Sequence, residues 1–279
     1  MRVFIHSGVA SFLSRARPWL LRAEVENCLI WSICDQLLTS LNAVRDVYLA
    51  TVEEGEAVAA CALRTPPNKA VITRGSEPAL KCLVESLGER YETLPAVLGP
   101  EPEVRRFAVM WAQHFGSVIQ PGMRQRIYEA RQVQPLPWQV SGRMRQANNS
   151  DLPILSPWIA ALNEETQVTH GANPTVMARE RIAQSRLFVW EDGPVVSMAA
   201  QGSRTNSGAL INLVYTPPGL RGRGYASACV AALTKELLSK DHAYCCLFTD
   251  LENQTSNSIY PRIGYRPVCD MTDYNLAPG

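Results

Sequence analysis

The chain has 279 residues, of which 46% are hydrophobic, and its formal net charge is +1 at pH 7. This length allows one large or two ordinary domains with hydrophobic cores, and the near-neutral charge argues against nucleic acid or an anionic membrane as a partner. No apolar stretch reaches the roughly 18 to 20 residues that span a bilayer, and the N-terminus lacks a clear signal region, so we expect a cytoplasmic protein.

The eight cysteines form no C-x-x-C pair and lie mainly within apolar strand or helix patterns. In a chain of this length they are interpreted as buried, reduced thiols and not as a disulfide framework or a zinc site. The four histidines add no ligand spacing. The sequence therefore predicts no metal centre.

Helix and strand patterns follow one another through the first half of the chain. Apolar residues recur with helical spacing from residue 8 to residue 40, and the rhythm breaks near Pro18. The other expected elements are a hairpin of strands 47–52 and 57–63, a strand at 70–73, a helix at 77–88, a strand at 94–98, a helix at 101–115 and a strand at 124–132.

The same order begins again after a proline-containing linker at 133–141. The expected elements are a strand at 142–147, a helix capped by Ser150 and Asp151, a helix at 174–184, a hairpin of 186–191 and 194–201, a strand ending at Tyr215, a helix reaching residue 240, a strand at 243–249, a helix at 254–262 and a last strand at 265–276. Because the same order of helices and strands occurs in both halves, the sequence predicts a duplicated α/β unit.

The segment 209–240 reads as a strand, a glycine-rich basic loop and a helix. The strand stops at Thr216-Pro217-Pro218-Gly219, because two prolines cannot continue it, and the loop Leu220 to Gly224 opens the helix. Main-chain N–H groups at a helix start attract anions, and glycines let a phosphate approach the main chain. With the charge of Arg221 and Arg223, this loop is interpreted as a phosphate cradle.

Two familiar phosphate loops fit this segment poorly. A P-loop needs a Gly-Lys pair, and the chain has none. A dinucleotide fingerprint needs three glycines, whereas Gly222, Gly224 and Ser227 supply two, with Asp250 as the acidic residue that would close the next strand. The late position behind a hairpin also disfavours that second interpretation.

Arg221 to Ala226 matches R-x-x-G-x-[GA] and resembles the acyl-CoA-binding motif of the GNAT superfamily of N-acetyltransferases. Downstream, Asn253 to Tyr265 resembles that superfamily's second signature, and the run Leu247 to Asp270 is similar to the FR47-like branch, which is related to glycine N-acyltransferases. In motif, the resemblance covers residues 142–276; over the first half it extends only to architecture.

The resemblance implies an α/β fold of two tandem GNAT-like domains, each a mixed, mostly antiparallel sheet flanked by helices. Residues 1–135 would form a degenerate domain and residues 142–279 the catalytic one. The co-substrate would be acetyl-CoA or another acyl-CoA, without a metal. Its pyrophosphate would lie on the N–H groups of Gly222, Arg223, Gly224, Tyr225 and Ala226.

Further roles follow from the same resemblance. Main-chain groups of Leu213, Val214 and Tyr215 would bind the pantetheine arm and stabilise the oxyanion of a tetrahedral intermediate. Tyr260 would protonate the departing thiolate, and Asn253 would bind the cofactor arm or an ordered water.

Each of these roles has a plainer alternative. Asp250 and Glu252 are candidates for the base that deprotonates the amine, or they are a capping or solvated pair. Tyr260 is the candidate acid or a core aromatic. Gly222 and Gly224 form the cradle or only a tight turn.

The first half has a weaker equivalent of the cradle at Arg74-Gly75-Ser76-Glu77-Pro78. It has a single glycine, Glu77 would repel a phosphate, and Pro78 lacks an N–H. We therefore expect that this half has lost the cofactor site and closes the acceptor pocket or forms an interface.

The predicted function is an acyl-CoA-dependent N-acyltransferase for a small amine or an amino acid, with acetyl as the acyl group. The alternative is a non-catalytic module that senses acyl-CoA. The sequence does not name the acceptor, and it leaves a homodimer open.

Overall fold

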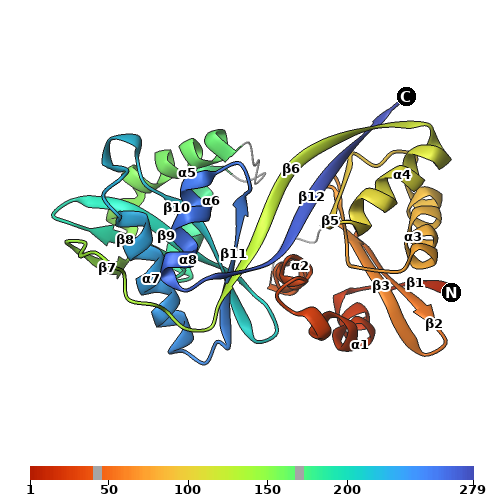
Figure 1. The fold of residues 1–279 in the computed structure, drawn as a ribbon, viewed down its shortest axis with the longest axis horizontal. Helices are drawn as coiled ribbons and strands as arrows, with labels where there is room; N and C mark the ends of the chain where they lie inside the picture. Colours follow the sequence, from red (N-terminus) through yellow and green to blue (C-terminus); the bar gives the residue numbers. More distant parts are fainter. Residues whose placement is uncertain (40–45, 167–172) are drawn as a thin grey trace. The chain divides into compact units, whose positions relative to one another are not determined.

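The computed structural model describes residues 1–39, 46–166 and 173–279. Its tertiary contacts divide the chain into two compact units (Figure 1). Unit 1 contains residues 1–127, 248–253 and 267–279, and unit 2 contains residues 128–247 and 254–266. Three strands therefore contribute residues to both units, and the division into 1–135 and 142–279 stays a prediction.

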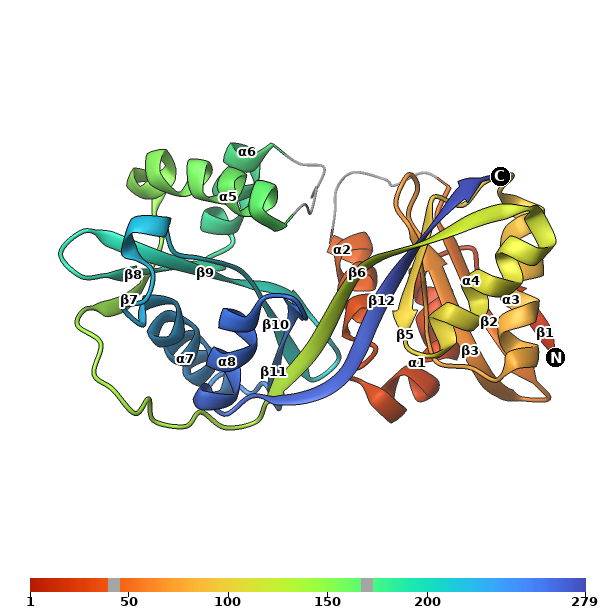
Figure 2. The same ribbon diagram turned by 45° about the horizontal axis from the view of Figure 1, so that its top comes forward.

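Unit 1 is a mixed sheet between two pairs of helices (Figure 2). The strand order is β1-β2-β3-β4-β5-β12-β6, and β4 and β5 are parallel while the other registered pairs are antiparallel. The elements are β1 (Arg2–Ile5), α1 (Val9–Leu20), a 3₁₀ turn (Leu21–Ala23), α2 (Cys28–Thr39), β2 (Tyr48–Glu54), β3 (Ala57–Arg64), β4 (Ala70–Ile72), α3 (Glu77–Arg90), β5 (Ala96–Pro100), α4 (Glu103–Phe115), β6 (Ser117–Ala130) and β12 (Arg266–Pro278).

The two faces of the unit 1 sheet carry separate cores, as alternation along β2 shows. Tyr48, Ala50 and Val52 pack with α3 and α4, whereas Leu49 packs with α1 and α2. Trp111 and Phe107 of α4 are almost fully buried in the first of these cores. Both sides of the sheet are thus covered by apolar helix faces.

Unit 2 repeats this plan. Its strands follow the order β7-β8-β9-β10-β11 with the end of β6 beyond them, and β10 and β11 are its parallel registered pair. Residues of α7 and α8 pack on one face and residues of α5 and α6 on the other. The elements are β7 (Arg143–Gln146), a 3₁₀ turn (Asn149–Asp151), α5 (Leu152–Thr166), α6 (Pro174–Ala183), β8 (Leu187–Glu191), β9 (Val195–Arg204), β10 (Gly208–Tyr215), a 3₁₀ turn (Pro218–Leu220), α7 (Tyr225–Leu238), β11 (Tyr244–Asp250) and α8 (Gln254–Ile263).

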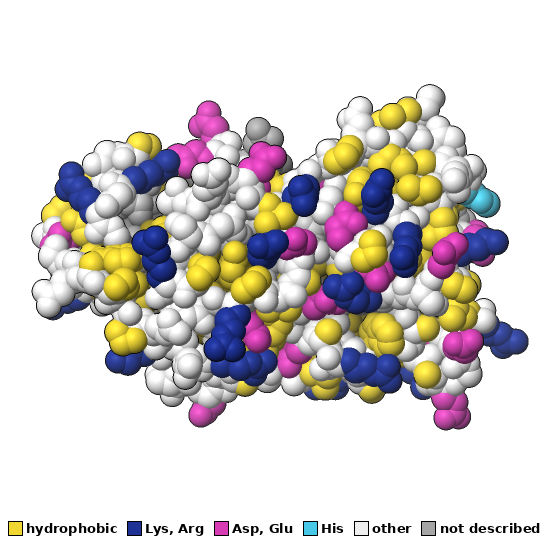
Figure 3. All heavy atoms as spheres, in the orientation of Figure 1, with side chains coloured by type: hydrophobic (Ala, Val, Ile, Leu, Met, Phe, Trp, Pro, Cys, Tyr) yellow, Lys and Arg dark blue, Asp and Glu magenta, His cyan; other side chains and the backbone are white. Residues whose placement is uncertain are grey.

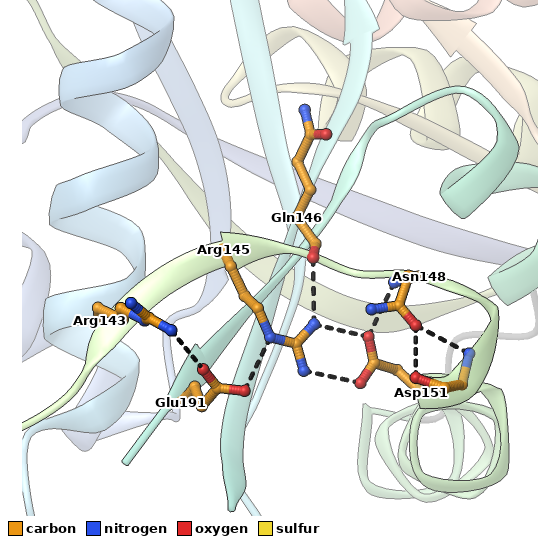
Figure 4. A network of polar contacts seen from close by, with 7 residues as sticks. Arg143, Arg145, Gln146, Asn148, Asp151 and Glu191 are labelled. Carbon is orange, nitrogen blue, oxygen red and sulfur yellow. Dashed lines mark hydrogen bonds and ion pairs between the residues drawn. The ribbon is translucent and has the colours of Figure 1, made fainter. Parts of the chain in front are cut away.

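A charged network joins β7 and β8 to the start of α5 (Figure 4). The Arg145 guanidinium donates to both carboxylate oxygens of Asp151 at 2.8 and 2.9 Å and to Glu191 Oε1 at 2.9 Å. Asp151 also accepts from the Asn148 N–H at 2.8 Å, which completes a capping box with Asn148. Because Asp151 is only 4% exposed, its charge depends on these donors.

The predicted fold class is confirmed: both units are mixed, mostly antiparallel sheets flanked by helices. Three local expectations differ from the structure. The strand β1 was not predicted, since a run of only four residues carries little signal. Strand β6 begins at Ser117 and passes through Pro121 and Gly122, whereas the expected strand began at residue 124. Helix α1 continues through Pro18 to Leu20.

Basic and acidic side chains are interspersed on the face shown in Figure 3, in keeping with the net charge of +1. Within the described ranges, no helix is both long and apolar enough to cross a membrane. The same residues contain no group of three or more His, Cys, Asp or Glu side chains that could hold a metal ion. All eight cysteines are free thiols, and six of them are buried, as predicted.

Candidate functional site

The strand β10 of unit 2 carries a β-bulge near its end. Leu213 has φ +49°, and the register against β9 shifts between Asn212 and Tyr215. Before the bulge, Ile211 packs on the α7 side of the sheet; after it, Leu213 and Tyr215 pack on the α5 side. A leucine in the left-handed region is strained, so the bulge is held by its surroundings.

The bulge follows the point where the registered pairing of β10 with β11 ends. Their registered parallel pairs run from Gly208 opposite Tyr244 to Leu210 opposite Cys246, whereas β10 continues to Tyr215. The main chain from Ile211 onward is thus not registered against β11. A strand edge of this kind can bind the amide groups of an extended ligand.

The loop after β10 forms a cradle of main-chain N–H groups. Gly222 and Gly224 have φ +78° and +83°, and Gly224 caps α7 without a side-chain hydrogen bond. The first backbone hydrogen bond of α7 runs from the Ala228 N–H to the carbonyl oxygen of the cap residue Gly224, at 2.9 Å. Among the described residues, none of the N–H groups from Gly222 to Ser227 donates to a protein oxygen. Together with the helix dipole they suit a phosphate.

The two cradle glycines have different surroundings. A Cβ at Gly224 would lie 2.7 Å from Trp138 Nε1 and 3.1 Å from Val140 Cγ2, so these two side chains of the linker pack directly against the loop at Gly224. A Cβ at Gly222 would meet no described heavy atom within 4 Å. The cradle is therefore packed on one side and open on the other.

Trp138 was predicted only as part of a linker. Its Nε1 is buried and has no hydrogen-bond partner in the parts of the chain that the structure describes. Its ring also lies 5.7 Å from the Arg262 guanidinium carbon of α8. In the sequence, Trp138 follows two prolines and stands two residues before Val140, and this apolar group was the available signal that the segment is packed. Its contact with Gly224, 86 residues further along the chain, could not be predicted from that signal.

The two arginines of the motif, Arg221 and Arg223, differ in their hydrogen-bond and ion-pair partners. Arg221 donates to the Thr216 carbonyl oxygen at 2.9 Å and binds Glu165 at the end of α5 through Nη2, at 2.7 and 2.8 Å from the two carboxylate oxygens. Arg223 is exposed and has no partner among the residues described. Arg223 is thus the cation available to an anion on the cradle.

The side chain of Tyr225 anchors the first turn of α7 to the β8–β9 turn. Its hydroxyl donates to Asp192 Oδ2 at 2.7 Å, and that oxygen also accepts from Ser141 Oγ at 2.7 Å. These hydrogen bonds hold the pKa of Asp192 below its usual value. The contribution of Tyr225 to the cradle is consequently its N–H group.

Tyr260 lies on α8 within the core of unit 2, where it is 7% exposed. Its ring packs 6.2 Å from Tyr128 and 5.8 Å from Tyr265. The hydroxyl has no hydrogen-bond partner among the described residues, and burial raises the pKa of Tyr260 to about 12. The side chain therefore stays protonated at neutral pH and can donate to a ligand.

Asp250, Glu252 and Asn253 belong to unit 1. Asp250 Oδ1 accepts from the Glu252 N–H at 2.9 Å, and the Asn253 N–H donates to the Asp250 carbonyl oxygen at 3.1 Å. These bonds shape the turn between β11 and α8. The Asp250 carboxylate thus has a local structural contact.

The equivalent loop in unit 1 is closed by its own side chains. Arg74 binds Glu26 Oε2 and Glu103 Oε2, each at 3.0 Å. A Cβ at Gly99 of β5 would lie 2.6 Å from Ile72 Cγ1 of β4, so these two strands remain tightly packed near their ends. Among the described residues of unit 1, the arginine at this position is therefore paired with two carboxylates and is not a free cation.

Residues 191–273 match a family model described as FR47-like protein, and a comparison with curated proteins found no match. The chain has the tandem GNAT fold. Three solved structures carry this conclusion over almost the full length of both chains, and their low identity limits it to the fold.

A GNAT acetyltransferase from Colwellia psychrerythraea is 11% identical with a TM-score of 0.60, covering 99% of this chain and 100% of that one. A GCN5-related N-acetyltransferase from Sphaerobacter thermophilus is 14% identical with a TM-score of 0.62, covering 98% and 95%. A tandem GNAT protein from the clavulanic acid biosynthesis pathway is 10% identical with a TM-score of 0.57, covering 100% and 98%. The fold of the chain is thus that of these GNAT structures, and residues 191–273 are similar to the FR47-like family.

Proposed function

We propose that unit 2 binds acetyl-CoA or another acyl-CoA and transfers the acyl group to the nitrogen of a small amine or amino acid. The observation that carries this proposal is the continuity of the bulged end of β10 with the N–H cradle at α7, within one unit. An extended ligand with an amide-rich arm and a pyrophosphate has the two kinds of polar group that these elements can bind.

The cradle would take the pyrophosphate. Six N–H groups from Gly222 to Ser227 have no acceptor among the described residues and would bind its oxygens, and the helix dipole favours negative charge there. Arg223 adds a cation that has no partner among the same residues. The bulge turns the main chain of Leu213 to Tyr215, whose groups would bind the pantetheine arm and the thioester carbonyl. A main-chain donor to the developing oxyanion lowers the barrier by about 3 kcal/mol.

Tyr260 would act on the departing sulfur. The neutral amine attacks the thioester carbon, the tetrahedral intermediate collapses, the C–S bond breaks, and the thiolate takes a proton. A tyrosine with a pKa of about 12 is a weak acid toward a thiolate, whose usual pKa is about 8.5. Tyr260 therefore serves first as a hydrogen-bond donor that stabilises the thiolate. The base takes the amine proton as the C–N bond forms, and this proton replaces the one that Tyr260 passes to the sulfur, so that Tyr260 ends the reaction protonated.

The base that deprotonates the amine is proposed from Asp250 and Glu252. The hydrogen bond between Asp250 Oδ1 and the Glu252 N–H makes Asp250 the more rigid of the two, so Glu252 is the better candidate for a mobile carboxylate. Asn253 would bind the cofactor arm or a water molecule. Replacing each carboxylate by its amide separates these assignments.

The proposal is tested by calorimetric titration with CoA and acetyl-CoA, followed by a thiol-release screen against amines and amino acids. Arg223→Glu should weaken CoA binding about 10-fold, because one charge-assisted contact is lost and repulsion is added. Arg179→Glu on α6 makes the same charge change at another exposed residue and should leave the affinity unaltered. Absence of CoA binding to the wild-type protein would refute the proposal.

The same pair of measurements separates an enzyme from a sensor. An enzyme releases CoA thiol with at least one acceptor, and the rate depends on acceptor concentration. Saturable CoA binding without thiol release across the panel would favour a non-catalytic acyl-CoA sensor, and Glu252→Gln would then change nothing measurable.

A further inference from the structure

A groove on unit 1, separate from the cradle, lies between the edge strand β1 and helix α3. It holds about 300 Å³ and is lined by Met1, Val3, Ile5, Cys82, Glu85, Ser86 and Glu89. Among the described strands, β1 is the terminal one in the sheet order and its registered partner is β2 (Figure 2). We propose that this groove binds an extended peptide with lysine or arginine at alternate positions, which adds to β1 as a further strand.

The hydrogen-bond phase of β1 supports strand addition. The His6 N–H donates to the Leu49 oxygen at 2.8 Å, so the alternation of an antiparallel pair turns the polar groups of Arg2 and Phe4 toward β2. The N–H and C=O groups of Val3 and Ile5 then point outward, away from the sheet. An incoming strand meets two residues that present both a donor and an acceptor.

The same two residues form the floor of the groove. Val3 and Ile5 lie opposite Val52 and Ala50, which face α3, so their side chains point toward the helix as well. Ile5 is 54% exposed, which is unusual for an isoleucine on a sheet. A bound strand would cover this apolar surface with side chains that project toward α3.

The wall of the groove is acidic. Cys82, Glu85, Ser86 and Glu89 follow i, i+3, i+4 and i+7 spacing and form one stripe of α3. Glu85 and Glu89 are exposed, and neither is in an ion pair within the described part of the chain. Lys81, one turn before Glu85, and Arg90, which binds Asp46, lie outside the lining, whereas Met1 with its α-amino group belongs to it.

The spacing of these charges matches a strand. Four residues of helix separate Glu85 from Glu89 by about 6 Å, and alternate residues of a strand are about 6.7 Å apart. Lysines at alternate positions would lay their aliphatic stems on Val3 and Ile5 and bring their ammonium groups to the two carboxylates. This charge complementarity selects a basic peptide over a second copy of the chain, whose own β1 carries a single arginine directed to the other face.

The test uses fluorescence anisotropy with a labelled eight-residue peptide of alternating lysine and threonine, and a control peptide with glutamate in place of lysine. The full chain should bind the basic peptide saturably and the acidic peptide not at all. Glu85→Lys with Glu89→Lys should weaken binding at least about 10-fold through two reversed charges, while Glu92→Lys, an exposed residue beyond α3, should change it less than about 2-fold.

Backbone pairing is tested separately. Val3→Pro removes one outward N–H but none that faces β2, a placement that edge strands tolerate, and should weaken binding about 10-fold. Should this variant not fold, a peptide N-methylated on alternate amides supplies the same test on unaltered protein. Equal binding by these variants or peptides, no saturable binding, or light scattering that shows the chain pairing with itself through β1 would overturn the proposal.

Discussion

Arg221 of the cradle loop holds the carboxylate of Glu165 with its Nη2 at 2.7 and 2.8 Å from the two oxygens. The arginine that precedes the two cradle glycines is therefore neutralised by the end of α5. Both side chains are nearly half exposed, so the pair adds little to folding stability. Its effect falls on anion binding, because a phosphate and Glu165 compete for one guanidinium.

Glu165→Gln should consequently tighten CoA binding by about 2- to 5-fold, since an exposed ion pair is worth up to about 1 kcal/mol. Calorimetric titration with CoA measures the change, and urea unfolding should show no loss of stability. Glu164→Gln alters a neighbouring exposed carboxylate that has no ion-pair partner among the described residues and serves as the control. An unchanged affinity in Glu165→Gln would show that Arg221 does not contact the phosphate.

Gly224→Ala should destabilise the protein more than Gly222→Ala. Both residues have positive φ, which costs an alanine about 1–2 kcal/mol, but only Gly224 packs against Trp138 and Val140. Overpacking adds about 1–3 kcal/mol at Gly224. Urea denaturation of the two variants provides the comparison, and equal free energies of unfolding would show that the linker does not support the cradle.

Tyr260→Phe should lower turnover with little change in CoA affinity or stability. The removed hydroxyl has no protein partner among the described residues, so the fold loses no hydrogen bond. Because the pKa of Tyr260 is about 12, no step in the pH dependence of the rate between pH 6 and pH 9 should arise from it. Steady-state kinetics and CoA titration decide the matter, and full activity in Tyr260→Phe would remove this residue from the mechanism.

Asp151→Asn should cost about 2–4 kcal/mol of stability at neutral pH, because it leaves the Arg145 guanidinium without its bidentate partner and weakens the capping box. The hydrogen bonds from Arg145 hold the pKa of Asp151 below its ordinary value of about 3.9. The stabilisation is therefore complete above that unfolded-state pKa and is lost as the pH falls through the lower folded-state pKa.

Unfolding curves of the wild-type protein and Asp151→Asn should accordingly converge as the solution is acidified below pH 4. Glu164→Gln, which removes an exposed carboxylate near the other end of α5, should show no such pH dependence. A constant difference between wild type and Asp151→Asn across the acid range would mean that packing, and not charge, stabilises the start of α5.

Periodicity and turn residues were sufficient to predict most elements of this fold. The alternation in β2 and the helical stripe in α7 are local properties, and so are the glycines that cap the helix and open the cradle. The packing of Trp138 beneath Gly224 and the ion pair of Arg221 with Glu165 were not predictable in this way. They join residues that are far apart in the chain, and no local propensity encodes which partner a side chain will meet.

The bulge at Leu213 was unpredictable for a further reason. Its β-branched and apolar neighbours describe a regular strand, and a leucine gives no sign of positive φ. Tertiary packing against α5 and α7 overrides the local preference. As a result, Leu213 and Tyr215 face α5, whereas Ile211 before the bulge faces α7. The strained residue thus lies within the candidate site, where sequence patterns are least informative.

The composition of the two units has a consequence for biosynthesis. Met271 to Asn275 of β12 pair with β5, so the sheet of unit 1 is completed by residues near the other end of the chain. A ribosome that has made only the residues before β12 leaves one edge of β5 without this neighbour, so the sheet of unit 1 closes only after unit 2 has been synthesised. Truncation at the linker would therefore yield two fragments with exposed edges prone to aggregation.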